Sequence, residues 1–530
     1  PAGPPRPRWP RWVRPLAALL LAAPAAASAV LLGEDPLVAA AALLVLLQLF
    51  TLATARTDRD DFRMAVLAFF QLLAASALSS SLGFAAVFVT FMLLSTWTLL
   101  VYHLRQELAA QPPGEPPPAR RFFTFPFVAS TTLLAAATLV FTAAIFLVLP
   151  RVGRGFLQRA APQPLRLSGF SEVVRLGEVG EVKRDPTVVM RVRAPAPEAL
   201  VEPIRFWRGA AFDRYDGLTW SRPAGDRRYV GPAADGRFVV AEARPGGRLV
   251  RQVVSLEPTN TAVLFGASRP VALAPSPAAP RALPLVFRDS LDGVSGPAAP
   301  PVRIEYVVES DLSRPPASAL RAAGRRYPAG FERYLTLPPL DPRVARLARA
   351  VTAGATTPYD QAIALEQHLR TAYAYSLEVR PSGRQPPLEE FLFETRAGYC
   401  EYSATAMAIL LRVLGIPSRL VSGFLGGEWN EYGGYYIVRQ SDAHTWVEAY
   451  FPGEGWVAFD PTPPAGTQPP ARSPLSALAR YLDALQNRWD RYVVGYSLAD
   501  QRQAARRVRQ ETAELAAAVR AALGRAAAAA

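Results

Sequence analysis

Residues 396–417 read RAGYCEYSATAMAILLRVLGIP and contain Cys400, the only cysteine of the 530-residue chain. Apolar and small residues recur every three or four positions after Cys400, which predicts a buried helix. Gly415 and Pro417 supply the signal that ends it. We therefore expect Cys400 in the first turn of this helix, where unpaired backbone N–H groups and the positive end of the helix dipole favour a thiolate.

The overall composition limits the classes of protein to consider. A chain of 530 residues predicts about three or four structural units. Its 58 basic and 44 acidic residues give a net charge of +14, which is spread along the chain without a dense basic block. This pattern favours a solvated arginine-rich surface, and we expect no nucleic-acid partner. A single cysteine excludes an intrachain disulfide and disfavours a structural zinc site.

Long uncharged apolar runs dominate residues 1–150. Each run is close to the roughly 20 residues that a membrane-spanning helix needs, and a signal peptide would not explain five successive runs. Residues 1–150 are therefore predicted to form a five-helix transmembrane anchor in the lipid bilayer, with spans in 16–32, 37–55, the two halves of 64–102 and 127–149.

The short loops between these runs predict the orientation of the anchor. Arginines precede the first span and occupy the loops after the second and the fourth, whereas residues 33–36 and 79–83 contain no arginine or lysine. By the positive-inside rule, the N-terminus lies in the cytoplasm and everything after Pro150 lies outside it.

The following residues, 151–315, are predicted to form a β-rich extracytoplasmic module. Short β-branched runs alternate there with Gly, Pro and Asp clusters, and Asp216-Gly217 has the pattern of a hairpin turn. The aromatic residues of this module are either core or a contact surface. The predicted strands cover 187–192, 237–240, 249–255 and 302–308.

Residues 316–464 are predicted to form an α+β core. Asp341-Pro342 opens one helix, with an aspartate N-cap and proline at the first helical position, and 358–373 forms another. Strands follow the cysteine helix, and a helix followed by an antiparallel sheet is an α+β arrangement. Residues 465–530 are predicted to be a proline-rich linker and a helical tail.

The cysteine has candidate partners for nucleophilic catalysis on these strands. Such a nucleophile needs a base, and a third group that orients the base. His444 falls on a predicted strand, and Asp460 at the end of the next strand is placed to reach its imidazole. Asp442 competes for this role, but on one strand its side chain would point parallel to that of His444. The pattern favours a Cys400–His444–Asp460 triad in a papain-like order.

Other residues near the triad are candidates for a supporting role. The backbone N–H of Cys400 is a candidate oxyanion donor, which is typically worth ~3 kcal/mol. Tyr399 and Glu401 flank the cysteine, and Trp446 shares the predicted strand face of His444, so these three are candidates for substrate binding or the site wall. An ordinary core position is the alternative for Trp446. We expect no metal and no cofactor.

Four motifs in this half resemble the core of the bacterial transglutaminase-like superfamily. They are GYCEYSAT at 398–405, LGIPSRLVSG at 414–423, DAHTWVE at 442–448, and the segment from GW at 455 to DPT at 460–462. The apolar N-terminus, with 184–190 and 206–217, is similar to the membrane-anchored TgpA-type members. Those members usually carry one more span after the core, and residues 465–530 contain no uncharged run long enough for one.

The resemblance implies a function as well as a fold. It implies that Cys400, His444 and Asp460 act as the triad of a thiol acyltransferase, tethered to the bacterial inner membrane, with its catalytic domain in the periplasm. The donor would be a protein or peptide glutamine or amide, and the acceptor an amine or water. A papain-like peptidase or amidase and a catalytically silent envelope scaffold are the alternatives. The oligomeric state is not predicted.

Overall fold

The computed structural model describes most of the chain after residue 35. The described residues are 36–54, 58–79, 81–109, 124–148, much of 165–195, 204–464 apart from short gaps within 278–284 and 380–384, 474–494, and a few within 506–514. The chain divides into one compact unit of residues 161–481 and a second unit formed by 1–160 and 482–530.

The N-terminal unit contains long helices at four of the five predicted spans. They are α2 (Pro36–Thr54), α3 (Asp58–Leu78), α4 (Leu82–Ala109) and α5 (Phe125–Val148). Within the described residues, three helices are long and apolar enough to cross a membrane, at Leu37–Thr54, Leu82–Glu107 and Phe125–Ile145. α3 begins with a charged turn and is not among them, and the predicted span 16–32 lies outside the described residues.

Two large antiparallel sheets form the frame of the 161–481 unit. The seven-stranded sheet has the order β17-β18-β2-β8-β13-β10-β7, and the five-stranded sheet has the order β20-β19-β16-β3-β9. The bounds in the first are Glu428–Asn430, Tyr435–Arg439, Val188–Arg193, Leu249–Leu256, Ile304–Asp311, Pro270–Pro275 and Phe238–Val239. Those in the second are Gly455–Phe459, Ala443–Phe451, Ser418–Leu425, Phe206–Phe212 and Gly266–Ala267.

Strands from both predicted regions pair with one another in these sheets. β16 pairs with β19 on one side and with β3 on the other, and β18 pairs with β2. Because β2 and β3 come from the first region, the predicted division between residues 315 and 316 marks a change in local structure rather than a boundary between sheets.

Three small sheets and several short helices complete this unit. The sheets are β1 (Val173–Arg175) with β5 (Thr219–Ser221) and β4 (Arg214–Tyr215), β12 (Val294–Ser295) with β11 (Val286–Asp289) and β6 (Arg227–Val230), and β14 (Ala374–Tyr375) with β15 (Ala397–Gly398). The short helices are α6 (Ala317–Ala322), α9 (Pro387–Glu390), η2 (Val182–Arg184), η4 (Phe331–Tyr334), η5 (Phe391–Thr395) and η6 (Gln440–Asp442).

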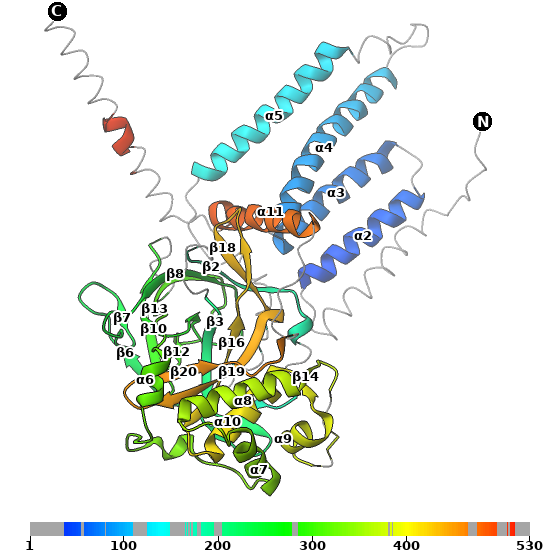
Figure 1. The fold of residues 1–530 in the computed structure, drawn as a ribbon. Coiled ribbons are helices and arrows are strands. Elements are labelled where there is room, and N and C mark those ends of the chain that lie inside the picture. The colour runs from blue at the N-terminus through cyan, green and yellow to red at the C-terminus, as the bar shows by residue number, and fades with distance from the viewer. Residues whose placement is uncertain are drawn as a thin grey trace, which may run out of the picture. The chain divides into compact units, whose positions relative to one another are not determined.

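The longer helices of this unit lie together on one side of the five-stranded sheet (Figure 1). They are α7 (Pro342–Val351), α8 (Pro358–Ala372) and α10 (Cys400–Val413), and α10 packs on β16 and β19. Asp341 caps α7 by accepting a hydrogen bond from the N–H of Arg343, and Pro342 is the first helical residue, as predicted. The C-terminal region adds α11 (Pro474–Trp489) and η8 (Asp490–Val494), and most of the predicted tail lies outside the described residues.

The turn that the sequence predicts at Asp216-Gly217 joins β4 and β5. Gly217 has φ +107°, and the side chain of Asp216 accepts hydrogen bonds from the N–H groups of Leu218 and Thr219. Trp220 on β5 is fully buried, and its indole N–H donates to the hydroxyl of Thr405 on α10 at 3.0 Å. This aromatic residue therefore belongs to the core that supports the cysteine helix.

Candidate active site

Cys400 is the first residue of α10, which confirms the predicted position at a helix start. Tyr399 is the N-cap, with extended backbone angles, and no side chain caps this helix end. At the other end, Gly415 has φ +73°, and the N–H groups of Gly415 and Ile416 donate to Arg412 and Leu411 in a Schellman arrangement. The helix termini are therefore set by the local sequence, and the thiol lies at the positive end of the helix dipole.

His444 is carried by β19, an inner strand of the five-stranded sheet between β20 and β16. It lies opposite Gly423 of β16 in the antiparallel register. A side chain at Gly423 would collide with the backbone oxygen of Trp207 and would lie 2.7 Å from the ring of Trp446. The glycine thus leaves room for the Trp446 ring beside β16.

The imidazole of His444 joins the other two members of the predicted triad. Its Nε2 lies 3.1 Å from Oδ2 of Asp460, and Asp460 directly follows β20. Cys400 interacts with the same imidazole, whose Nδ1 is buried and makes no hydrogen bond of standard geometry. Cys400 is 0% exposed, and His444 and Asp460 are each 1% exposed. The structure thus gathers all three predicted residues in one buried cluster.

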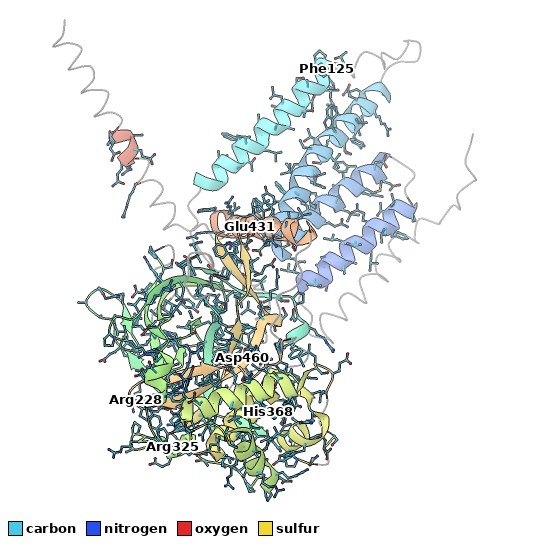
Figure 2. The ribbon with its side chains drawn as sticks, viewed as in Figure 1. Phe125, Arg228, Arg325, His368, Glu431 and Asp460 are labelled. Carbon is cyan, nitrogen blue, oxygen red and sulfur yellow. The ribbon has the colours of Figure 1, made fainter. Side chains whose placement is uncertain are left out.

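Asp460 is held in place from several directions. Its Oδ2 also accepts a hydrogen bond from Arg205 Nη2 at 3.0 Å, and its Oδ1 accepts one from the N–H of Thr462 at 3.2 Å. Two α8 side chains fix its backbone: the N–H donates to Glu366 at 2.7 Å, and the carbonyl accepts from Arg370 at 3.2 Å. Figure 2 shows Asp460 close to α8, the helix that also carries His368. The carboxylate is therefore preorganised towards the imidazole.

Aromatic rings stack beside the imidazole of His444. Phe206 of β3 lies parallel to the His444 ring, with centroids 6.2 Å apart, and stacks on Trp446 at 4.5 Å. The guanidinium of Arg205 covers the same Phe206 ring at 5.1 Å. Trp446 therefore packs on Phe206, which in turn lies parallel to the imidazole.

The charges in the cluster favour a thiolate–imidazolium pair. Burial opposes the thiolate, but the charge of Lys183, followed by His444 and a backbone hydrogen bond with Thr445, lowers the pKa of Cys400 to about 7. Burial also opposes the imidazolium, but the charge and hydrogen bond of Asp460 raise the pKa of His444 to about 9. Despite burial, the charge and hydrogen bond of His444 keep the pKa of Asp460 well below its usual range.

The remaining predicted residues have different placements. Asp442 lies in η6, before β19, rather than on the strand, and its Oδ2 accepts a hydrogen bond from the N–H of Arg439 at 2.8 Å. The carboxylate of Asp442 therefore stabilises the turn at η6, and the partner of His444 is Asp460. Tyr399 and Glu401 are both buried; burial raises the pKa of Tyr399, and the charge of Glu401 raises it further.

Sequence reasoning missed four side chains around the triad. Arg205 and Phe206 contact it from the β-rich region, and Glu366 and Arg370 contact it from one face of α8. The only signal in the sequence was the similarity of the Phe206 segment to TgpA-type proteins, because a pairing across more than 200 residues leaves no local pattern. The i, i+4 spacing of Glu366 and Arg370 indicates that they share one face of α8. It does not indicate which residue this face contacts.

A cavity of about 480 Å³ is lined in part by Arg205 and Phe206, the side chains that contact Asp460 and His444. Arg208, Arg419 and Glu448 also line the cavity, and the two arginines form buried ion pairs with Glu448 at 3.1 and 2.7 Å. Within the described part of the chain, no cluster of three or more His, Cys, Asp or Glu side chains is placed to hold a metal ion.

Comparison with known families gives two matches that together cover most of the chain. Residues 2–317 match the TgpA N-terminal domain, and residues 345–461 match the transglutaminase-like superfamily. The second match contains the whole triad. The first contains Arg205 and Phe206, so the cluster is built from both matched regions.

Individual relatives agree with these matches. A protein-glutamine gamma-glutamyltransferase of Pseudomonas aeruginosa is 28% identical over 470 residues, which cover 85% of this chain and 62% of the relative. The uncharacterized protein YebA of Bacillus subtilis is 41% identical over 139 residues, which cover 25% of this chain and 19% of that protein. The chain thus spans less than two thirds of either relative.

Among solved structures, the crystal structure of the periplasmic domain of TgpA from Pseudomonas aeruginosa bound to ethylmercury is 28% identical. The match covers 57% of this chain and 100% of that domain, with a TM-score of 0.46.

Proposed function

Because the chain belongs to the TgpA-type family of transglutaminase-like proteins, we propose that it is a membrane-tethered thiol acyltransferase. The observation that carries this proposal is the buried Cys400–His444–Asp460 cluster, in which a helix-start cysteine faces an imidazole held by a carboxylate. The donor is a glutamine or amide of a protein or peptide, and the acceptor is an amine or water.

The first half-reaction forms an acyl-enzyme. The Cys400 thiolate attacks the carboxamide carbonyl, and the oxygen that becomes negative is placed to accept a hydrogen bond from the backbone N–H of Cys400. The imidazolium of His444 then protonates the departing nitrogen, which leaves as ammonia, and a thioester remains on Cys400. Asp460 stabilises the charged imidazole and fixes its orientation before this proton transfer.

The second half-reaction releases the acyl group. Neutral His444 takes a proton from the attacking amine, the C–N bond forms, and the C–S bond breaks to restore the thiolate. An amine acceptor gives an isopeptide bond, whereas water gives deamidation. Because the three side chains are at most 1% exposed, donor binding must be accompanied by local opening over the thiol.

Membrane tethering is argued from the apolar helices and the charges that flank them. Leu133, Leu134 and Phe141 on α5 are each about 70% exposed, which suits contact with lipid. The arginines before 16–32 and after the second and fourth predicted spans favour a cytoplasmic N-terminus. The 161–481 unit would then act in the periplasm, on envelope proteins or peptides.

An amine-incorporation assay tests the proposed activity. The full chain in detergent micelles is incubated with a glutamine peptide and a fluorescent primary amine, and the labelled product and the released ammonia are measured. We expect incorporation by the wild type and by His368→Asn, and its loss in Cys400→Ala and His444→Asn. His368 is a matched control because it lies on α8 outside the cluster. Peptide fragments or ammonia without labelled product would contradict acyl transfer to amines.

A further inference from the structure

Lys183 is the only lysine among the 58 basic residues of the chain. It lies in η2, before β2, and is half-buried, whereas its neighbour Arg184 is exposed. All the other basic residues of the chain are arginines. The compact ammonium group of lysine differs from the planar guanidinium in fitting a small buried space as a point charge. These features indicate a specific role for this side chain.

The segment that carries Lys183 is fixed to the turn that precedes His444. The N–H groups of Ser441 and Gln440 in η6 donate to the carbonyls of Asp185 and Thr187 at 2.8 and 2.9 Å. Arg439 Nη1 donates to the carbonyl of Pro186 at 3.0 Å. η2 also packs against η6. Lys183 therefore has a defined position relative to the start of β19.

Tyr375 links Lys183 to the cysteine. β14 and β15 pair in parallel with Tyr375 opposite Gly398, and the N–H of Ser376 donates to the carbonyl of Gly398 at 2.9 Å. Tyr375 thus lies beside the residue two positions before Cys400. Lys183 Nζ is 6.0 Å from the centroid of the Tyr375 ring. Burial raises the pKa of Tyr375, and the nearby charge of Lys183 lowers it.

Lys183 and Cys400 each have titratable neighbours among the described residues. Lys183 faces Cys400, Tyr375 and Asp442, and Cys400 in turn faces His444, Lys183, Tyr375 and Tyr399. Burial works against a charged lysine, but the Cys400 thiolate and then Tyr375 raise the pKa of Lys183, so that its ammonium persists. The charge of Lys183 lowers the pKa of Cys400, and the hydrogen bond and charge of His444 lower it as well.

We propose that Lys183 is a positioning residue of the acyl-transfer site, whose ammonium group holds Cys400 in the thiolate form together with His444. It is supplied by the segment before β2, whereas the triad comes from the region that matches the transglutaminase-like superfamily. The N-terminal region therefore contributes an activating charge as well as structural support. This inference rests on the proposed function only in taking Cys400 as the nucleophile.

A pH titration of the thiol tests the inference without requiring turnover. Because Cys400 is the only cysteine, the ultraviolet absorbance of its thiolate is obtained by subtracting the signal of Cys400→Ala, in the full chain in detergent micelles. Loss of a positive charge that acts on the thiolate shifts such a titration by about one pH unit or more. Lys183→Met and Lys183→Gln should therefore titrate at least about one unit higher than wild type.

Two charge controls separate an electrostatic role from a structural one. Lys183→Arg keeps the charge and should titrate closer to wild type than the neutral variants do. Arg184→Met removes the adjacent exposed charge and should leave the titration unchanged. A folded neutral Lys183 variant that titrates like wild type, or an Arg184→Met shift equal to that of Lys183→Met, would overturn the inference. A shift in a protein that transfers no acyl group would refute the proposed function and leave the role of Lys183 intact.

Discussion

The carboxylate of Asp460 determines how His444 is oriented and charged. Its contacts with Arg205, Thr462, Glu366 and Arg370 hold it in place before any substrate binds. A neutral amide at this position can still form a hydrogen bond but cannot stabilise the imidazolium. Replacing Asp460 with asparagine therefore separates its two effects on His444, which are to orient the ring and to stabilise its positive charge.

Asp460→Asn is expected to lower kcat/KM for amine incorporation by about 10³- to 10⁴-fold, as loss of the carboxylate does in related triads. Arg205→Met removes a hydrogen-bond donor to Oδ2 of Asp460. Because the Arg205 side chain is 48% exposed, we expect kcat/KM to fall by about tenfold or less. Steady-state kinetics of both variants, with thermal unfolding as a control, check this order. Equal losses in the two folded variants would contradict the assigned roles.

The pH dependence of the reaction follows from two opposite shifts. The lowered pKa of Cys400, about 7, means that thiolate is gained as the pH rises through 7. The raised pKa of His444, about 9, means that the proton needed by the leaving ammonia is lost as the pH rises through 9. Acyl transfer should therefore rise through pH about 7 and fall above about 9. A rate that rises only near pH 8.5, the ordinary range of a free thiol, would show that Cys400 is not activated.

At the scale of elements, the packing of β16 between β3 and β19 depends on Gly423. A side chain there meets the backbone of Trp207 and the ring of Trp446, whereas one at Gly231 meets open space. Gly423→Ala should reduce the free energy of unfolding by about 2–3 kcal/mol, as overpacking does, and should also lower activity by displacing Trp446. Gly231→Ala is the matched control and should lie within about 0.5 kcal/mol of wild type.

Denaturant unfolding of both glycine variants measures this difference. Equal stabilities would show that β16 can shift at little cost, and the tight packing of Trp446 against it would then not matter for the site.

Elements with a strong local pattern could be predicted from the sequence. The cysteine helix has its apolar spacing and a glycine stop, and α7 has an Asp-Pro start, so both were placed correctly. Asp442 was wrongly placed on a strand, because one hydrogen bond to Arg439 turns the chain there into η6. The roles of Phe206 and Lys183 depend on pairings between distant segments, which no local pattern encodes.

On the scale of the whole molecule, the triad region depends on strands that precede it. β3 pairs along β16, β2 pairs with β18, and Trp220 packs on the cysteine helix. Residues 316–464 expressed alone would leave β16 with an unpaired edge and α10 without this cover. We expect that fragment to aggregate or to lack a cooperative thermal transition, whereas residues 161–481 should unfold cooperatively.

Circular dichroism melting of the two fragments checks this dependence. A folded 316–464 fragment with a sharp transition and reactive Cys400 would show that the triad region is independent of the N-terminal strands.

Capture of the acyl-enzyme tests the central claim most directly. The full chain is mixed with a glutamine peptide, quenched in acid and analysed by intact mass spectrometry, with Cys400→Ala in parallel. We predict an adduct on Cys400 equal to the mass of the peptide less that of ammonia, which disappears when a primary amine is added. An adduct that lacks part of the peptide chain, or no adduct while ammonia is released, would contradict acyl transfer through Cys400.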